Sequence, residues 1–250
     1  MFQKLLIRNK HGELTTQQIV IIIIIIISFI VLLYFLFRLN PNETSSKQIC
    51  YNSVVLLSKS SSLVGNLDCK TNYLCLSGGD SCTSFNPTST VKVDVSKKEE
   101  ILKALADEMA DCWWMFGKGE IDYVGHPLGG DSHCAICAGI KFDKKIQDKI
   151  KEITYAELSD YMKTHSSSHD SSSTYLKYLY GVNSLESSNT ELKDFNVNFA
   201  PISTSSEYVI TIGIDPEPPL ISDKYIKVSI VKTDEVSSKT RCEIFDITKS

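Results

Sequence analysis

A run of apolar residues from Ile19 to Phe37 is the feature that most limits how this chain can fold. It contains seven consecutive isoleucines, Ile21–Ile27, and its only ionisable group is the phenol of Tyr34. A helix rises about 1.5 Å per residue, so the run would span about 28 Å, close to the roughly 30 Å hydrocarbon core of a bilayer. In lipid, a single segment can satisfy its backbone hydrogen bonds only as a helix. We therefore predict a transmembrane helix over residues 19–37.

Basic residues are distributed unevenly around this run. Three precede it, and two follow it at Arg38 and Lys47. Segments rich in Lys and Arg tend to stay on the cytoplasmic side, so this excess favours a cytoplasmic N-terminal segment, residues 1–18. The sequence therefore predicts a single-pass protein of the cell membrane. A juxtamembrane linker over residues 38–48 would lead to a domain on the extracellular side.

The residues before the apolar run allow a second interpretation. A basic stretch, a small residue, a polar linker and a long apolar helix follow one another here, and together they resemble a prepilin-type (class III) signal. This resemblance implies cleavage after Gly12, with the helix kept in the mature protein. The chain has Gln17 where pilins often carry Glu. The simpler interpretation, which we favour, is an uncleaved signal anchor whose helix is capped by Thr15 or Thr16.

All eight cysteines lie C-terminal to the apolar run. An even number confined to one side of a membrane segment favours disulfide bonds in an oxidising compartment. The alternative is a set of reduced, buried or metal-bound thiols in a cytosolic domain. We expect disulfide bonds and an extracytoplasmic domain over residues 49–250. The candidate cysteines are Cys50, Cys69, Cys75, Cys82, Cys112, Cys134, Cys137 and Cys242.

Apolar spacing predicts an α+β fold for this outer domain. Apolar residues recur three and four positions apart in two helical segments, Lys97–Phe116 and Lys144–Lys163. The first begins directly after Ser96, which has the spacing of a capping box with Glu99 in the first turn. The expected fold is thus a single N-terminal transmembrane helix plus a disulfide-braced α+β domain with two main helices and an antiparallel sheet.

The remaining segments predict strands and loops. Alternating or β-branched residues indicate five strands, the last three forming an antiparallel meander: 91–95, 133–142, 208–214, 225–231 and 241–247. The cysteine-dense stretch 67–85 contains turn residues, and we expect little regular structure in it. Two Ser-rich stretches, 164–174 and 185–193, are predicted to be solvated polar loops.

The sequence Cys134-Ala-Ile-Cys137 is the sharpest chemical motif. One interpretation is a thiol–disulfide oxidoreductase, but no βαβ pattern precedes the motif and no helix follows it. A second is a zinc site formed by Cys112, His133, Cys134 and Cys137, with no second pair of ligands nearby. We favour a third, in which Cys134 and Cys137 pair separately with distant partners such as Cys112 or Cys242.

The rest of the sequence gives little indication of metal binding, nucleic-acid binding or catalysis. His165 and His169 have the four-residue spacing of metal ligands on a helix, but their Ser-rich surroundings favour a loop. The net charge of −4 gives no general basic field for nucleic acid. Nucleophile elbows, phosphate loops and dinucleotide fingerprints are absent from the sequence. We therefore expect no nucleic-acid partner, no cofactor, no resident metal and no catalysis.

Four stretches of the sequence resemble uncharacterised single-pass membrane proteins of archaea with small genomes: 14–18, 69–71, 106–120 and 134–143. The resemblance covers most of residues 10–145, and it implies an archaeal cell-surface protein without supplying an activity. Our prediction is a membrane-anchored structural or interaction component of the cell envelope. Its partners would be the lipid bilayer and another envelope protein or copies of itself. The alternatives are a pilin-like subunit of a surface assembly and a membrane-tethered thiol oxidoreductase.

Overall fold

The chain forms two compact units, Met1–Thr44 and Ser45–Ser250. The computed structural model describes residues 16–38, 41–59, 67–83, 86–123, 132–183, 201–214, 225–236 and 242–244. Three features predicted above lie outside these residues: the cleavage site after Gly12, the polar stretch 185–193 and the side chain of Cys242.

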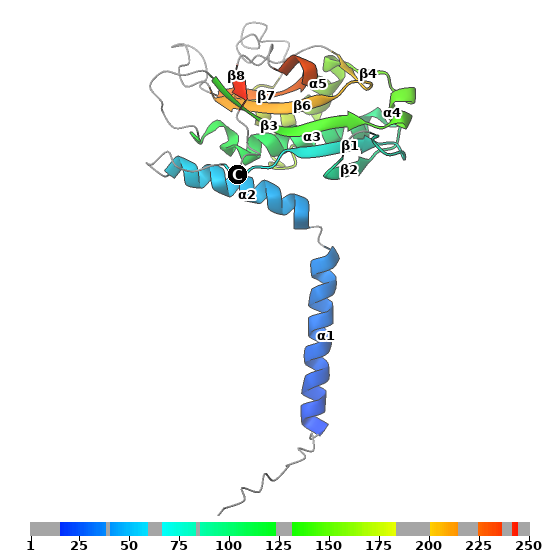
Figure 1. The fold of residues 1–250 in the computed structure, drawn as a ribbon, viewed down its shortest axis with the longest axis vertical. Helices are drawn as coiled ribbons and strands as arrows, with labels where there is room; N and C mark the ends of the chain where they lie inside the picture. Colours follow the sequence, from blue (N-terminus) through cyan, green and yellow to red (C-terminus); the bar gives the residue numbers. More distant parts are fainter. Residues whose placement is uncertain are drawn as a thin grey trace, which may run out of the picture. The chain divides into compact units, whose positions relative to one another are not determined.

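The first unit is built around helix α1, Thr16–Arg38, which includes the whole apolar run (Figure 1). None of the side chains from Gln17 to Tyr34 is buried, and Ile25 is 61% exposed. Within the described residues, this is the one helix that is long and apolar enough to cross a membrane, and a signal sequence has the same properties. The prediction that residues 19–37 form one continuous helix is confirmed.

Helix α2, Pro41–Lys59, begins after two intervening residues. Proline suits the first turn of a helix, because a backbone N–H at that position would have no intrahelical acceptor and its absence costs no hydrogen bond. Most of the expected 38–48 linker is therefore helical, and the second unit begins at Ser45, slightly before the predicted start of the domain. Cys50 and Val54 lie four residues apart, and both are buried in the core of this unit.

The second unit contains a mixed sheet with the strand order β2-β1-β3-β6-β7 (Figure 1). The strands are β1 (Asn72–Ser77), β2 (Ser89–Lys92), β3 (Ser132–Phe142), β6 (Tyr208–Ile214) and β7 (Tyr225–Lys232). β1 is parallel to both of its neighbours, whereas β6 is antiparallel to β3 and β7. The central strand is thus β3, and the predicted antiparallel sheet is wrong for the β1 side.

Two strands account for this difference. β1 lies in the cysteine-dense stretch where we expected little regular structure, and its residues Leu74–Ser77 are all buried. A strand buried on both faces shows no alternation of apolar and polar residues, so periodicity could not reveal it. β8, Cys242–Ile244, pairs in parallel with the start of β3 and not with β7. The predicted meander therefore exists only as the β6–β7 pair.

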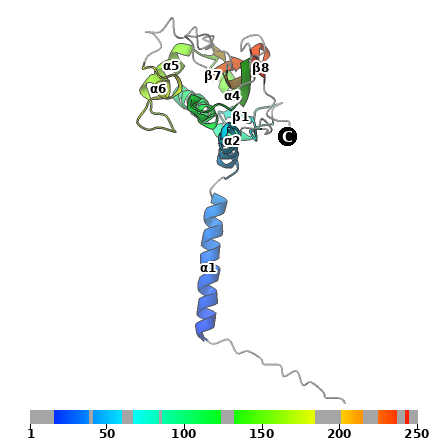
Figure 2. The ribbon, with the colours of Figure 1, turned by 90° about the vertical axis from the view of Figure 1, so that its left-hand side faces the viewer.

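Helix α3, Lys98–Met115, packs between the sheet and two further helices, α5 (Tyr155–Thr164) and α6 (Tyr175–Tyr180). Figure 2 shows α5 and α6 on one side of α3 and the strands on the other. The predicted apolar face is buried, as Leu105 and Cys112 show. The expected capping box is wrong, because the helix begins later and the Ser96 hydroxyl donates to Asp94.

The second predicted main helix, 144–163, is divided into two helices. α4, Lys144–Lys149, ends before the short strand β4, Glu152–Ile153, which pairs with β5, Ile202–Ser203. α5 then begins at its own capping box, in which Thr154 and Glu157 bond each other's backbone N–H groups. This second cap competes with continuation of one helix, since it satisfies N–H groups that a continuous helix would bond internally.

Candidate functional site

Three disulfide bonds connect the elements around α3. Cys50–Cys69 joins α2 to the segment before β1, Cys75–Cys82 closes the turn after β1, and Cys112–Cys137 joins α3 to β3. Cys134 is also disulfide-bonded, and the described part of the chain contains no free cysteine. Disulfide bonds in the second unit are therefore confirmed for three pairs.

The Cys134-x-x-Cys137 motif does not form a bond within itself. Cys137 pairs with Cys112, and Cys134 and Cys137 are each only 2% exposed. Cys112 and Cys137, two of the four alternative zinc ligands, are bonded to each other. A sulfur in a disulfide is not the thiolate that zinc requires, so neither is available as a ligand. Among the described residues, no group of three or more His, Cys, Asp or Glu side chains could hold a metal ion. This geometry gives the zinc and oxidoreductase interpretations no support.

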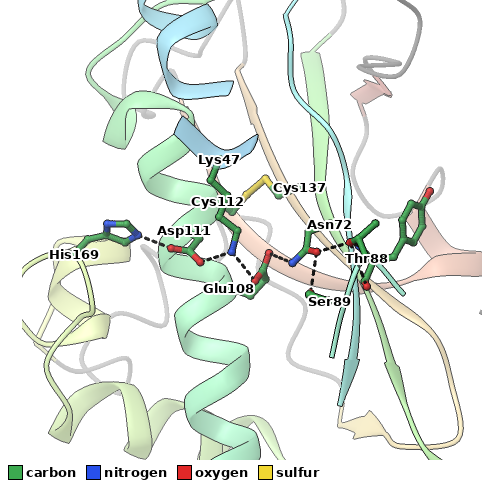
Figure 3. Close-up of polar contacts among 10 residues, drawn as sticks. Lys47, Asn72, Thr88, Ser89, Glu108, Asp111, Cys112, Cys137 and His169 are labelled. Carbon is green, nitrogen blue, oxygen red and sulfur yellow. Dashed lines mark hydrogen bonds and ion pairs between the residues drawn. A yellow bond between two sulfur atoms is a disulfide. The ribbon is translucent and has the colours of Figure 1, made fainter. Parts of the chain in front are cut away.

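A buried polar network begins at Glu108, which is 4% exposed in the middle of α3 (Figure 3). Its Oε2 accepts from Lys47 Nζ of α2 at 3.1 Å, and its Oε1 accepts from Asn72 Nδ2 of β1 at 3.0 Å. The Asn72 carbonyl oxygen accepts in turn from the hydroxyls of Thr88, at 2.6 Å, and Ser89, at 3.0 Å. One carboxylate therefore connects α2, α3 and the β1–β2 edge of the sheet.

Asp111 extends the network by one turn of α3. Its Oδ2 lies 2.6 Å from Lys47 Nζ, and its Oδ1 lies 2.5 Å from His169 Nε2 (Figure 3). Lys47 thus bridges two carboxylates of the same helix. The histidine belongs to the Ser-rich stretch 164–174, so the network reaches a segment that lies far from α3 in the sequence.

Stacked aromatic rings flank the outer end of the network. The Trp114 ring lies between Tyr51 of α2, with centroids 4.8 Å apart, and His169, with centroids 5.2 Å apart. The other neighbour of the His169 ring is Tyr178 of α6, at 6.2 Å between centroids. The interplanar angles are 11°, 8° and 15°, so the four rings are nearly parallel. The imidazole is therefore fixed by stacking as well as by its hydrogen bond.

Residues 165–174 form the predicted polar loop, and of these residues only Ser167 is buried, so the loop is solvated but attached to the domain at particular points. Ser166 and Thr174 form a β-bridge, and Ser167 is only 4% exposed. His165 Nε2 lies 3.1 Å from Glu99 on α3, and its ring stacks on Tyr161 with centroids 4.0 Å apart. The two histidines thus contact different carboxylates of α3, and they do not form the paired metal ligands that their spacing allowed.

The two carboxyl groups facing Lys47 have pKa values shifted in opposite directions. Burial raises the pKa of Glu108, and the charge of Lys47 and the Asn72 hydrogen bond only partly oppose this. Burial also raises the pKa of Asp111, but His169 and Lys47 together outweigh it and leave that pKa below its ordinary value. All four carboxylate oxygens accept a hydrogen bond within the protein. These four bonds join the two carboxylates of α3 to α2, to β1 and to the segment 164–174, so the network connects elements of the domain.

Sequence reasoning missed Lys47, Asn72 and Glu108. Glu108 carried a usable signal, because it lies within the apolar face of α3 between Leu105 and Cys112. A charged residue at a buried position requires a partner. Nothing in the sequence identifies Lys47 and Asn72 as those partners.

Comparison of the chain with protein-family models found no match. The curated proteins and the solved structures include no match to it either. Its function is therefore inferred from the contacts described above.

Proposed function

We propose that this chain is a single-pass membrane protein and that its disulfide-braced α+β domain is a structural or interaction component of the cell envelope. The observation that carries this proposal is the pairing of Cys50–Cys69, Cys75–Cys82 and Cys112–Cys137 in a domain that follows an exposed apolar helix. The proposal includes the archaeal cell-surface origin that the sequence resemblance implies.

The disulfides support an oxidising compartment. Cytosolic thiols are kept reduced, whereas extracytoplasmic domains keep disulfides. Two of the bonds join separate parts of the fold and the third closes the turn after β1, and no free cysteine accompanies them among the described residues. Together with the basic residues before α1, they favour a cytoplasmic N-terminus and an extracellular domain.

The polar network supports a structural role over a catalytic one. Catalytic acids and bases need a contact with substrate. Here the oxygens of Glu108 and Asp111 are already used to join α2, α3, the sheet and the segment 164–174. Such a network favours one fixed arrangement of these elements, which suits a domain that presents a constant surface to a partner.

The test is to locate the chain in cells and count its thiols. We expect it to remain in the membrane pellet after an alkaline wash, with its C-terminal domain cleaved by protease added outside intact cells. Without reductant, an alkylating reagent should modify none of the cysteines of the denatured protein, and after reduction it should modify all eight. Eight reactive thiols before reduction would contradict the extracellular location.

A matched control removes the anchor alone. The double change Ile24→Lys and Ile26→Lys places two charges at the centre of α1, where each disfavours insertion by about 2.5–3.5 kcal/mol. This variant should leave the membrane pellet. If the wild-type chain also leaves it, α1 does not anchor the protein and the proposal is wrong.

A further inference from the structure

The first turn of α2 is kept near the end of α1 by the covalent chain. Only residues 39 and 40 separate Arg38, the end of α1, from Pro41, the start of α2. An extended chain spans at most about 3.3–3.6 Å per residue, so the two helix ends lie within about 11 Å of each other. If α1 spans the bilayer, α2 begins at the membrane surface.

α2 has one side that contacts the domain and one that does not. Cys50 and Val54, at 1% and 0% exposure, lie on the buried side. Ile49 and Leu56 are exposed by 44% and 69%, and they are seven residues apart. Seven residues are close to two helical turns, so these two apolar side chains lie along one line of the helix.

α2 cannot rotate to bury this line. The Cys50–Cys69 disulfide fixes it to the segment before β1. Lys47 adds ion pairs with Glu108 and Asp111 on α3. The side carrying Ile49 and Leu56 is therefore held outward by contacts on the opposite side of the same helix.

We propose that Ile49 and Leu56 insert into the lipid–water interface beside the anchor, so that α2 lies on the membrane surface. This inference rests on the proposed anchoring by α1. Two side chains alone would bind a membrane weakly, but the anchor holds α2 at a high effective concentration, so a weak apolar contact suffices. Lys59 is exposed in the last turn of α2, where a long basic side chain can reach lipid headgroups.

The proposal assigns a mechanical role to the polar network. Because Lys47 and the Cys50–Cys69 disulfide attach α2 to α3 and to the segment before β1, contact of α2 with lipid would fix the orientation of the whole domain. The domain would then present one constant face away from the membrane.

The experiment uses the full chain in nanodiscs of zwitterionic lipid, with or without bromine atoms on the acyl chains. A fluorescent noncanonical residue replaces one residue at a time: Ile49, Leu56, Ser58 or Ile25. Ser58 is the matched control, because it is exposed on α2 but lies about 200° around the helix from Leu56. Ile25 reports whether α1 is inserted.

We expect brominated lipid to quench strongly at position 25, by about twofold at positions 49 and 56, and little at position 58, as for an apolar face buried about 5–10 Å into the interface. Strong quenching at 25 with equal, weak quenching at 49, 56 and 58 would overturn the placement of α2 and leave the anchor intact. Absence of quenching at position 25 would overturn both the anchor and the inference that rests on it.

Discussion

His169 Nε2 lies 2.5 Å from Asp111 Oδ1 although the two residues are 58 positions apart in the sequence. The same imidazole stacks on Trp114, three residues beyond Asp111 on α3. A hydrogen bond and a ring contact thus fix one side chain from a Ser-rich stretch against a single helix. This pairing makes the segment 164–174 part of the folded domain.

Replacing His169 should release this segment. In His169→Ala, Asp111 loses one of its partners and Trp114 loses a stacked ring, so we expect the free energy of unfolding to fall by about 1–3 kcal/mol. Limited proteolysis should then cut within residues 166–173 faster than in the wild type. His165→Ala is the matched control, because it also removes one stacked ring, on Tyr161, but its partner Glu99 is largely exposed and such pairs contribute little. Equal cleavage rates in the two variants would contradict a specific role for His169.

The Asp111 contacts also predict a pH dependence. Because the folded-state pKa of this carboxyl is depressed, its stabilising contribution is present above its unfolded pKa of about 3.9 and is lost as the pH falls through the lower folded value. Without the His169 hydrogen bond, the Asp111 pKa should rise and this contribution should shrink. The measurement is a ¹³C NMR titration of the carboxyl carbon in wild type and His169→Ala. An unchanged titration would show that Lys47 alone depresses this pKa.

The raised pKa of Glu108 predicts the opposite dependence of stability on pH. Burial raises its folded-state pKa, so its contribution favours folding most below the unfolded pKa and declines as the pH rises through the folded value. Glu108→Gln keeps an acceptor for Asn72 and removes the buried charge, so its stability relative to wild type should increase from pH 5 to pH 8. Glu108→Ala leaves the Asn72 amide without its acceptor and should cost about 2 kcal/mol. Urea unfolding at both pH values tests this, and a glutamine variant as unstable as the alanine variant would refute it.

The disulfides should contribute unequally to stability. In the chain-entropy description, the Cys112–Cys137 bond, with a separation of 25 residues, contributes about 3.5 kcal/mol, and the Cys75–Cys82 bond, with a separation of 7, contributes about 2.4 kcal/mol. Paired Cys→Ala variants compared by urea unfolding give both values. A larger loss for the Cys75–Cys82 pair would show that loop length does not determine the order.

The mature N-terminus separates the two interpretations of α1. For an uncleaved anchor, mass spectrometry of the protein purified from its native membrane should detect residues before Glu13. A chain that begins at Glu13 would establish cleavage after Gly12 and favour the pilin-like alternative. Gly12→Leu should then block processing, whereas it should leave the mass of an uncleaved anchor unchanged apart from the substitution.

Local patterns predicted the helices better than the sheet or the site. α1 follows from an unbroken apolar run long enough to span a bilayer, and α3 follows from apolar residues three and four positions apart. β1 is buried on both faces and shows no period, and β8 pairs with a strand far away in the sequence. The network depends on such distant contacts as well, because Lys47 and Asn72 meet Glu108 only after α2, α3 and β1 have packed together. Of these residues, only Glu108 stands out before folding, as a charge on an apolar face.

The position of β8 affects when the domain can complete its fold. β3 receives β1 along residues 138–142 and β8 along residues 132–134, on the same edge. β8, the last strand among the described residues, therefore completes the pairing of the central strand. Because β8 follows the start of β3 by more than a hundred residues, this pairing cannot form until residues 242–244 have been synthesised. Removal of β8 would therefore expose an unpaired stretch of β3 to other chains.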